Sequence, residues 1–217
     1  MDTRKDFHQR IEELLGELLK MSDLCLDTID RTRDSFIELD PAKALRVIED
    51  DDRVDTLREY VEESGVELIA RQAPVAVDLR TIIVIMRLAQ HLERVGDLCV
   101  NIAKIAMGLK GRALTPWIEE NINEMFKRSR NILARAIEAF KRRDVEAADS
   151  LNLLDDQVDL IYIDFFTHFD KEREDGMDVI IRVVMVARFL ERIADHAVDI
   201  GEHVRFLVHG YWEDKPD

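Results

Sequence analysis

The feature that most constrains the fold of this chain is an internal sequence repeat. The segment 92–97 reads Leu-Glu-Arg-Val-Gly-Asp, and the segment 190–195 reads Leu-Glu-Arg-Ile-Ala-Asp. Both copies lie in the two most apolar stretches of the sequence, where a charged side chain is costly unless it has a partner. The duplication predicts two similar folding units, and its repeated acidic residues are the first place to look for a functional site.

The repeat extends well beyond this hexapeptide. Identical residues in the preceding segments stand 104 positions apart, whereas Glu93 and Glu191 stand 98 apart. The first half therefore contains six extra residues (104 minus 98), which we place around 71–74. We predict two repeats, residues 1–112 and 113–217. The matching pairs are Met21/Met125, Arg31/Arg135, Phe36/Phe140, Asp40/Asp144, Asp52/Asp156 and Asp55/Asp159.

The periodicity of apolar residues is helical along nearly the whole chain and predicts six helices, three in each repeat. Asp40 and Thr115 each precede a proline, and Asp144 precedes another apolar segment, so these residues are typical helix N-caps. The third helix of each repeat, around 82–89 and 179–186, is apolar on nearly every side. We therefore predict an all-α, elongated protein of two tandem three-helix bundles with their third helices at the centre. Further breaks are expected at Gly108, Gly111 and Gly176.

The composition excludes several classes of partner. With 31 Lys and Arg against 46 Asp and Glu, the net charge is −15, which repels nucleic acids and anionic lipids. Cys25 and Cys99 show no disulfide or zinc-ribbon spacing, which favours a reducing, cytoplasmic setting. The first residues do not resemble a signal peptide, and Arg87 and Arg182 interrupt the best candidates for a membrane span. Any membrane association is expected to be peripheral, through a protein partner.

The repeated acids form two helical ladders, because residues four apart share a helix face. Neighbouring carboxylates repel one another, so a bridging cation would stabilise each row. Oxygen ligands select hard cations such as Mg, Mn, Ca or ferric iron. The ladders are Glu93, Asp97 and Asn101 in the first repeat and Glu191, Asp195 and Asp199 in the second, with Asp52, Asp55, Asp156 and Asp159 on the preceding helices as helpers.

The two ladders differ at one position. Asn101 replaces the charged Asp199, which predicts weaker metal binding in the first repeat. His196 and His203 follow the second ladder, but Leu98 and Ile105 stand at the equivalent positions of the first. We therefore expect these two histidines to contact the metal ligands at most, and not to bind the metal themselves. The other histidines are assigned to the surface or to local packing: His8, His91, His168 and His209.

Three alternatives remain beside the metal hypothesis. Arg94 and Arg192 each stand three residues before the aspartate of the motif, so ordinary ion pairs could satisfy Asp97 and Asp195. A metal-free helical adaptor, with acidic faces that bind basic partners, would have the same fold. A ferritin-like di-iron oxidase is disfavoured, because it needs Glu-x-x-His pairs and the sequence contains none.

Four segments of the sequence match one known family: 71–80, 92–97, 101–104 and 190–198. Together they resemble the PhoU family of phosphate-signalling proteins, and the resemblance covers essentially the whole chain. It implies two three-helix bundles and a non-enzymatic cytoplasmic regulator that restrains phosphate uptake and the phosphate-starvation response. It also implies two partners, a phosphate ABC transporter and a sensor histidine kinase, and it leaves a homodimer open. Family members bind metals at the repeated acidic motifs, as multinuclear Fe or Zn clusters in some and as Mg or Mn in others, which here implicates Glu93, Asp97, Glu191 and Asp195.

Overall fold

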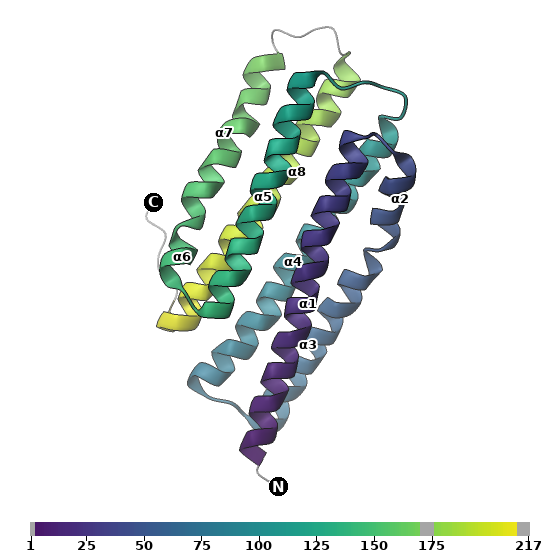
Figure 1. The fold of residues 1–217 in the computed structure, drawn as a ribbon. Helices are drawn as coiled ribbons and strands as arrows, with labels where there is room; N and C mark the ends of the chain where they lie inside the picture. The colour runs from purple at the N-terminus through teal and green to yellow at the C-terminus, as the bar shows by residue number, and fades with distance from the viewer. Residues whose placement is uncertain (1–2, 170–175, 212–217) are drawn as a thin grey trace.

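The computed structural model describes residues 3–169 and 176–211, and within them the chain is helical without strands. Figure 1 shows two groups of long helices that lie side by side and run roughly parallel to one long axis. The first group contains the helices of the first repeat and the second group those of the second. The helices are α1 (Thr3–Ile37), α2 (Pro41–Glu49), α3 (Asp52–Gln72), α4 (Ala76–Gly108), α5 (Pro116–Arg142), α6 (Val145–Asp149), α7 (Leu151–Phe169) and α8 (Met177–His209).

The predicted all-α fold of two tandem helical bundles is confirmed, and the middle helix of each bundle is divided by a break into two segments. In the first repeat the break falls at Asp50 and Asp51, between α2 and α3. In the second it falls at Ser150, whose hydroxyl donates to the carbonyl of Ala147 at 2.7 Å. Short polar side chains compete with the helical backbone for hydrogen bonds and therefore favour such breaks.

The predicted helix caps are confirmed. The Asp40 carboxylate accepts hydrogen bonds from the backbone of Ala42 and Lys43, and the Thr115 hydroxyl accepts one from Ile118. The Asp144 side chain caps α6 in the same way. Helix α4 ends at Gly108, and Gly176 precedes α8.

The connections between the helices follow the predicted breaks. Gly111 has a φ of 77° in the α4–α5 linker, a conformation that glycine adopts without strain. Only Ala73 to Val75 separate α3 from α4, so the six extra residues placed around 71–74 cannot all lie in this connection, and part of them lengthens the flanking helices. Part of the corresponding connection in the second repeat, 170–175, lies outside the described residues.

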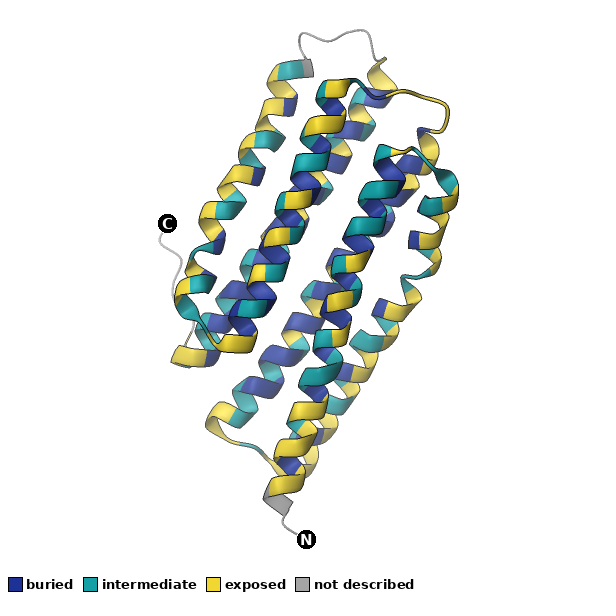
Figure 2. Ribbon diagram, viewed as in Figure 1, coloured by how far each residue is buried: buried dark blue, intermediate teal, exposed yellow. Residues whose placement is uncertain are grey.

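Helices α4 and α8 pack against one another at the centre, as the apolar pattern predicts. Figure 2 shows their buried faces turned toward the neighbouring helices. Ile82, Ile85, Val183 and Val186 are fully buried there. Helix α8 is not covered on all sides, however, since Ile181 is 53% exposed on a face that its neighbouring helices leave open. No helix in the described part of the chain is both long and apolar enough for a membrane span.

One hydrogen bond is repeated in both units and fixes the first helix of each against the third. The Cys25 thiol donates to the carbonyl of Leu92 at 3.3 Å, and the Ser129 hydroxyl donates to the carbonyl of Leu190 at 2.9 Å. Residues 25 and 129 are 104 positions apart, as the repeat requires. Burial raises the pKa of the Cys25 thiol, so Cys25 is a structural donor. The two acidic motifs therefore begin at equivalent anchored positions.

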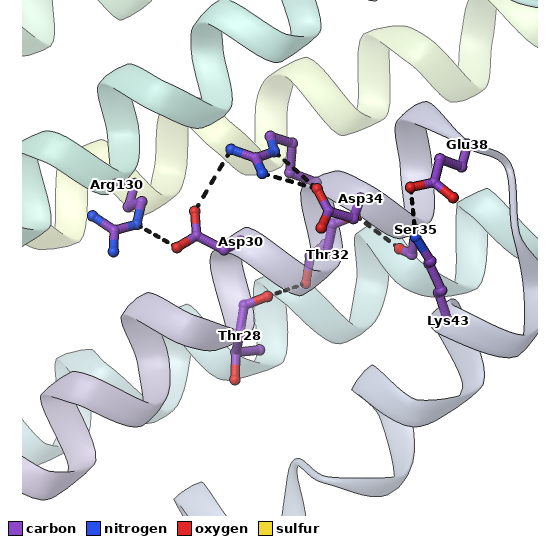
Figure 3. Close-up of polar contacts among 9 residues, drawn as sticks. Thr28, Asp30, Thr32, Asp34, Ser35, Glu38, Lys43 and Arg130 are labelled. Carbon is purple, nitrogen blue, oxygen red and sulfur yellow. Dashed lines mark hydrogen bonds and ion pairs between the residues drawn. The ribbon is translucent and has the colours of Figure 1, made fainter.

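The two units also meet through α1 and α5. The Arg130 guanidinium on α5 lies 2.8 Å from the carboxylate of Asp30 on α1, and Figure 3 shows this pair facing across the gap between the two helices. Asp30 also lies 3.8 Å from Arg33 on its own helix. Such half-exposed ion pairs contribute little to stability, so the apolar α4–α8 contact carries most of the junction.

Candidate metal centres

The first acidic cluster forms where the beginning of α3 packs against the middle of α4. Asp51 and Asp55 approach Glu93 and Asp97 of the motif, and all four side chains are partly buried. Burial, followed by the charges of Asp55, Asp97 and Glu93, raises the pKa of Asp51 from 3.8 to about 6. Burial also raises the pKa of Glu93. The cluster therefore concentrates negative charge that a cation would relieve.

The second acidic cluster has the same composition at the α7–α8 contact. Burial and the carboxylates of Asp159, Asp195 and Glu191 raise the pKa of Asp155 to about 7. Burial and Asp195 raise the pKa of Glu191 to about 6, although the Arg188 guanidinium opposes this shift. Glu191 is only 8% exposed. A charged residue so deeply buried requires compensation by a partner.

The acids that the structure brings to the two clusters differ in part from the predicted helpers. Asp55 and Asp159 lie at their clusters, but Asp52 and Asp156 are exposed. Asp51 and Asp155, one position earlier, approach the motif acids instead. The sequence contained a signal for them, because Asp51-x-x-x-Asp55 and Asp155-x-x-x-Asp159 have the same spacing as the motif itself. Each cluster thus combines two acid-x-x-x-acid pairs from neighbouring helices.

Asp199, the last residue of the second predicted ladder, faces two histidines. Asp199 lies 3.8 Å from the Nδ1 atom of His91 and 3.9 Å from that of His196, at the α4–α8 junction. Asn101 is half-buried on α4.

The ion-pair alternative holds in one repeat only. Arg94 lies 2.9 Å from Asp97 and 3.4 Å from Glu93. In the second repeat the partner of Glu191 is Arg188, and Arg192 forms no ion pair with Asp195 among the described residues. Ion pairing therefore accounts for part of the charge, and more completely in the first cluster than in the second.

The donor atoms of the second cluster suit a hard metal ion. Glu191 Oε2 and Asp155 Oδ1 are buried and have no hydrogen-bond partner within the described structure, and an orphaned buried carboxylate oxygen is costly without one. Asp155, Asp159, Glu191 and Asp195 would hold the ion, which would supply the missing positive charge. Neither acidic cluster brings three ligand atoms together within 4.8 Å in the described part of the chain, so metal binding would draw the carboxylates inward.

A group that the sequence did not predict lies at the α4–α8 junction. His91 Nδ1, His196 Nδ1 and an Asp199 oxygen lie within 4.8 Å of one another. His91, predicted to belong to the surface or to local packing, contacts His196 at 3.2 Å and His203 at 3.1 Å across the junction. Burial lowers the pKa of all three, that of His196 to about 4 and that of His203 to about 3. No sequence signal connects His91 with His196, because they are 105 positions apart.

Comparison with known proteins relates both repeats to one family. A family model described as the PhoU domain matches twice, at residues 18–106 and 122–204. The phosphate-specific transport system accessory protein PhoU homolog 1 of Methanothermobacter thermautotrophicus is 30% identical over 93% of this chain and 94% of that protein. The homolog 1 of Mycobacterium tuberculosis is 32% identical over 95% of both chains.

Two solved structures share the architecture. The crystal structure of PhoU from Pseudomonas aeruginosa matches with a TM-score of 0.86 and 29% identity, over 94% of this chain and all of that one. The phosphate transport system regulatory protein PhoU from Streptococcus pneumoniae matches with a TM-score of 0.87 and 26% identity, over 96% of this chain and all of that one.

Proposed function

Because this chain belongs to the PhoU family, we propose that it restrains phosphate uptake by acting on a phosphate ABC transporter in the cytoplasm. Relatives are named as accessory proteins of a phosphate-specific transport system, and this chain matches them over nearly their whole length. A sensor histidine kinase is the second proposed partner, through which the protein would repress the phosphate-starvation response. In this role the protein acts by binding and not by catalysis.

The proposed function includes metal binding at the two acidic clusters. The observation that carries it is the repeated convergence of two acid-x-x-x-acid pairs, centred on Asp51 with Glu93 and on Asp155 with Glu191. The buried Oε2 atom of Glu191, which has no hydrogen-bond partner in the described structure, supports this proposal because a cation would satisfy it. Hard ions such as Mg²⁺, Mn²⁺, Ca²⁺ or iron fit oxygen donors. A bound ion would hold α3 against α4 and α7 against α8, and so set the rigidity of the surface presented to a partner.

Deletion of the gene tests the regulatory role. The deletion strain should express phosphate-starvation genes in high phosphate, and the wild-type gene should restore repression. Affinity purification of the tagged protein from membranes tests the partners and should recover the phosphate transporter and the kinase. An unchanged starvation response in the deletion strain would contradict the regulatory role.

Metal binding is tested separately, since a metal-free adaptor with the same fold is the second candidate. Crystals soaked in Mn²⁺ should show anomalous density beside Asp51 and Glu93 and beside Asp155 and Glu191. A strain that carries Glu93→Gln and Glu191→Gln together should lose repression if metal is required. Full repression by this variant, with no metal density in the crystals, would favour the adaptor.

A further inference from the structure

We propose that His91, His196 and Asp199 form a third metal site, for a divalent transition metal ion such as Zn²⁺, at the junction of the two repeats. It differs from the acidic clusters in its donor atoms and in its ligands from both α4 and α8, and Glu93 of the first cluster lines the same cleft as His91 and His196. The proposal is independent of the regulatory function proposed above.

The geometry of the three ligand atoms carries the proposal. His91 Nδ1 and His196 Nδ1 are 3.2 Å apart, and Asp199 Oδ2 lies 3.8 and 3.9 Å from them. The point equidistant from the corners of such a triangle lies about 2.1 Å from each. Typical zinc bonds are roughly 2.0 to 2.2 Å to His nitrogen and carboxylate oxygen. An ion therefore fits among the three atoms with little movement of the side chains.

A neighbouring histidine supports the required tautomer. A ligand that binds metal through Nδ1 carries its proton on Nε2, and this proton normally has an acceptor. His91 Nε2 lies 3.1 Å from His203 Nε2, so the second nitrogen of His91 has a partner positioned for it. His203 is buried, with an exposed fraction of 6%. We therefore assign His203 as the residue that orients His91 and not as a ligand.

The donor set selects the metal class. Two imidazoles and one carboxylate bind Zn²⁺ and other divalent transition metals, whereas Mg²⁺ and Ca²⁺ prefer sites built from oxygen. Asp199 is 41% exposed at its side chain, and an open cleft of about 580 Å³ is lined by His91 and His196. The site is thus accessible from solvent, and three protein ligands would leave a position for water.

This site joins the two repeats, which the acidic clusters do not do. One ligand, His91, comes from α4 and the other two come from α8. The duplication does not repeat it, because Phe189 and Leu98 stand at the positions equivalent to His91 and His196. A bound ion would cross-link the central helices and resist their separation.

Competition between metals provides the test. The full-length protein is stripped with a chelator and placed in millimolar Mg²⁺, which favours occupation of the oxygen-rich clusters. It is then titrated with Zn²⁺ by calorimetry and with Co²⁺ by visible absorption, which reports imidazole coordination. We expect one equivalent of Zn²⁺ to bind to the parent protein, with the absorption of a Co²⁺ site of low coordination number.

Matched variants assign the ligands. Asp199→Asn, which alters a half-exposed side chain, and His91→Gln should each weaken Zn²⁺ binding at least about tenfold, and His203→Gln should weaken it about 10- to 100-fold. Two control substitutions should leave the binding of one equivalent of Zn²⁺ unchanged. They are His209→Gln, at an exposed histidine on α8, and Glu191→Gln, in the second acidic cluster. Circular dichroism verifies that each variant is folded.

Two results would overturn the proposal. The first is a parent protein that binds no Zn²⁺ in the presence of Mg²⁺. The second is equal Zn²⁺ affinity in the parent and in folded Asp199→Asn and His91→Gln. If Glu191→Gln abolishes the Zn²⁺ equivalent instead, the ion belongs to the acidic cluster, and the junction site is rejected while metal binding at the cluster is retained.

Discussion

The two acidic clusters have the same acid-x-x-x-acid spacing but different electrostatic surroundings. In the first, Arg94 pairs with both motif acids, and Gly96 leaves room for Asp51, whose Oδ1 lies 2.9 Å from where a Cβ would stand. In the second, Ala194 replaces that glycine, and two carboxylate oxygens are orphaned.

Burial and neighbouring carboxylates also raise the pKa of the partly buried helper aspartate further in the second cluster, to about 7 for Asp155 against about 6 for Asp51. Identical spacing thus does not fix the charge balance of a site, because the neighbours of the motif decide how much repulsion remains. The second cluster should gain more from a cation. These neighbours are therefore a second reason, beside the exchange of Asp199 for Asn101, to predict weaker metal binding in the first site.

The largest expected effect is on metal affinity. Glu191→Gln removes the most buried carboxylate of the second cluster and should weaken its affinity for Mn²⁺ by at least about tenfold, or about 1.4 kcal/mol. Glu93→Gln should weaken the first cluster less, because Arg94 already neutralises part of its charge. Calorimetric titration of the two variants and the parent measures this. Equal losses would remove the proposed difference between the clusters.

The next largest effect is expected on the pH dependence of the stability of the metal-free protein, which should differ between the two clusters. Between pH 3.8 and about 7 the folded protein holds a proton on Asp155 that the unfolded chain has lost. This group therefore makes stability fall as the pH rises from 3.8 through about 7. Asp155→Asn removes the titration and should stabilise the metal-free protein at pH 8 by about 1 to 2 kcal/mol, after a discount for the half-exposed site.

Urea unfolding in chelator at several pH values measures this gain, which should vanish below pH 4. Asp51→Asn serves as the matched variant and should gain less, because the pKa of Asp51 rises only to about 6. Burial lowers the pKa of His91, His196 and His203 and gives an opposite trend with pH. That trend is common to the variants and the parent, so it cancels in the difference. A gain that is constant with pH would contradict the prediction.

Substitutions at Gly96 and Ala194 test whether Asp51 needs the space that a glycine leaves beside it. In Gly96→Ala the new Cβ would force the Asp51 carboxylate away from α4, which should weaken metal binding in the first cluster. The higher helix propensity of alanine, about 1 kcal/mol, should offset the steric cost in the metal-free protein. The reciprocal Ala194→Gly should cost about 1 kcal/mol of stability and leave metal binding in the second cluster unchanged. Thermal unfolding with and without Mn²⁺ distinguishes these outcomes.

The smallest effect is expected at Arg94. Its side chain is 61% exposed, and exposed ion pairs are worth about 0.2 to 1 kcal/mol. Because a metal must compete with Arg94 for Glu93 and Asp97, Arg94→Gln should strengthen Mn²⁺ binding to the first cluster by about two- to fivefold. Lys104→Gln removes an exposed positive charge from the same helix and serves as the control. If both substitutions have the same effect, only the net charge matters.

The sequence by itself determined the helical class, the duplication, the helix caps and six of the eight acids in the clusters. These features depend on local chemistry and on residues that share one helix face, which the 3.6-residue period specifies. The same period predicted that α4 and α8 are central, since an apolar helix must find neighbours.

Only the tertiary structure decided how faces of different helices meet. The period does not give the rotation and register of one helix against the next, so the sequence favoured Asp52 and Asp156 over the adjacent Asp51 and Asp155. For the same reason Asp199 was assigned to the acidic ladder, although it faces His91 across the junction. The grouping of three histidines from two helices arises from the packing of α4 on α8, which no spacing along the chain records.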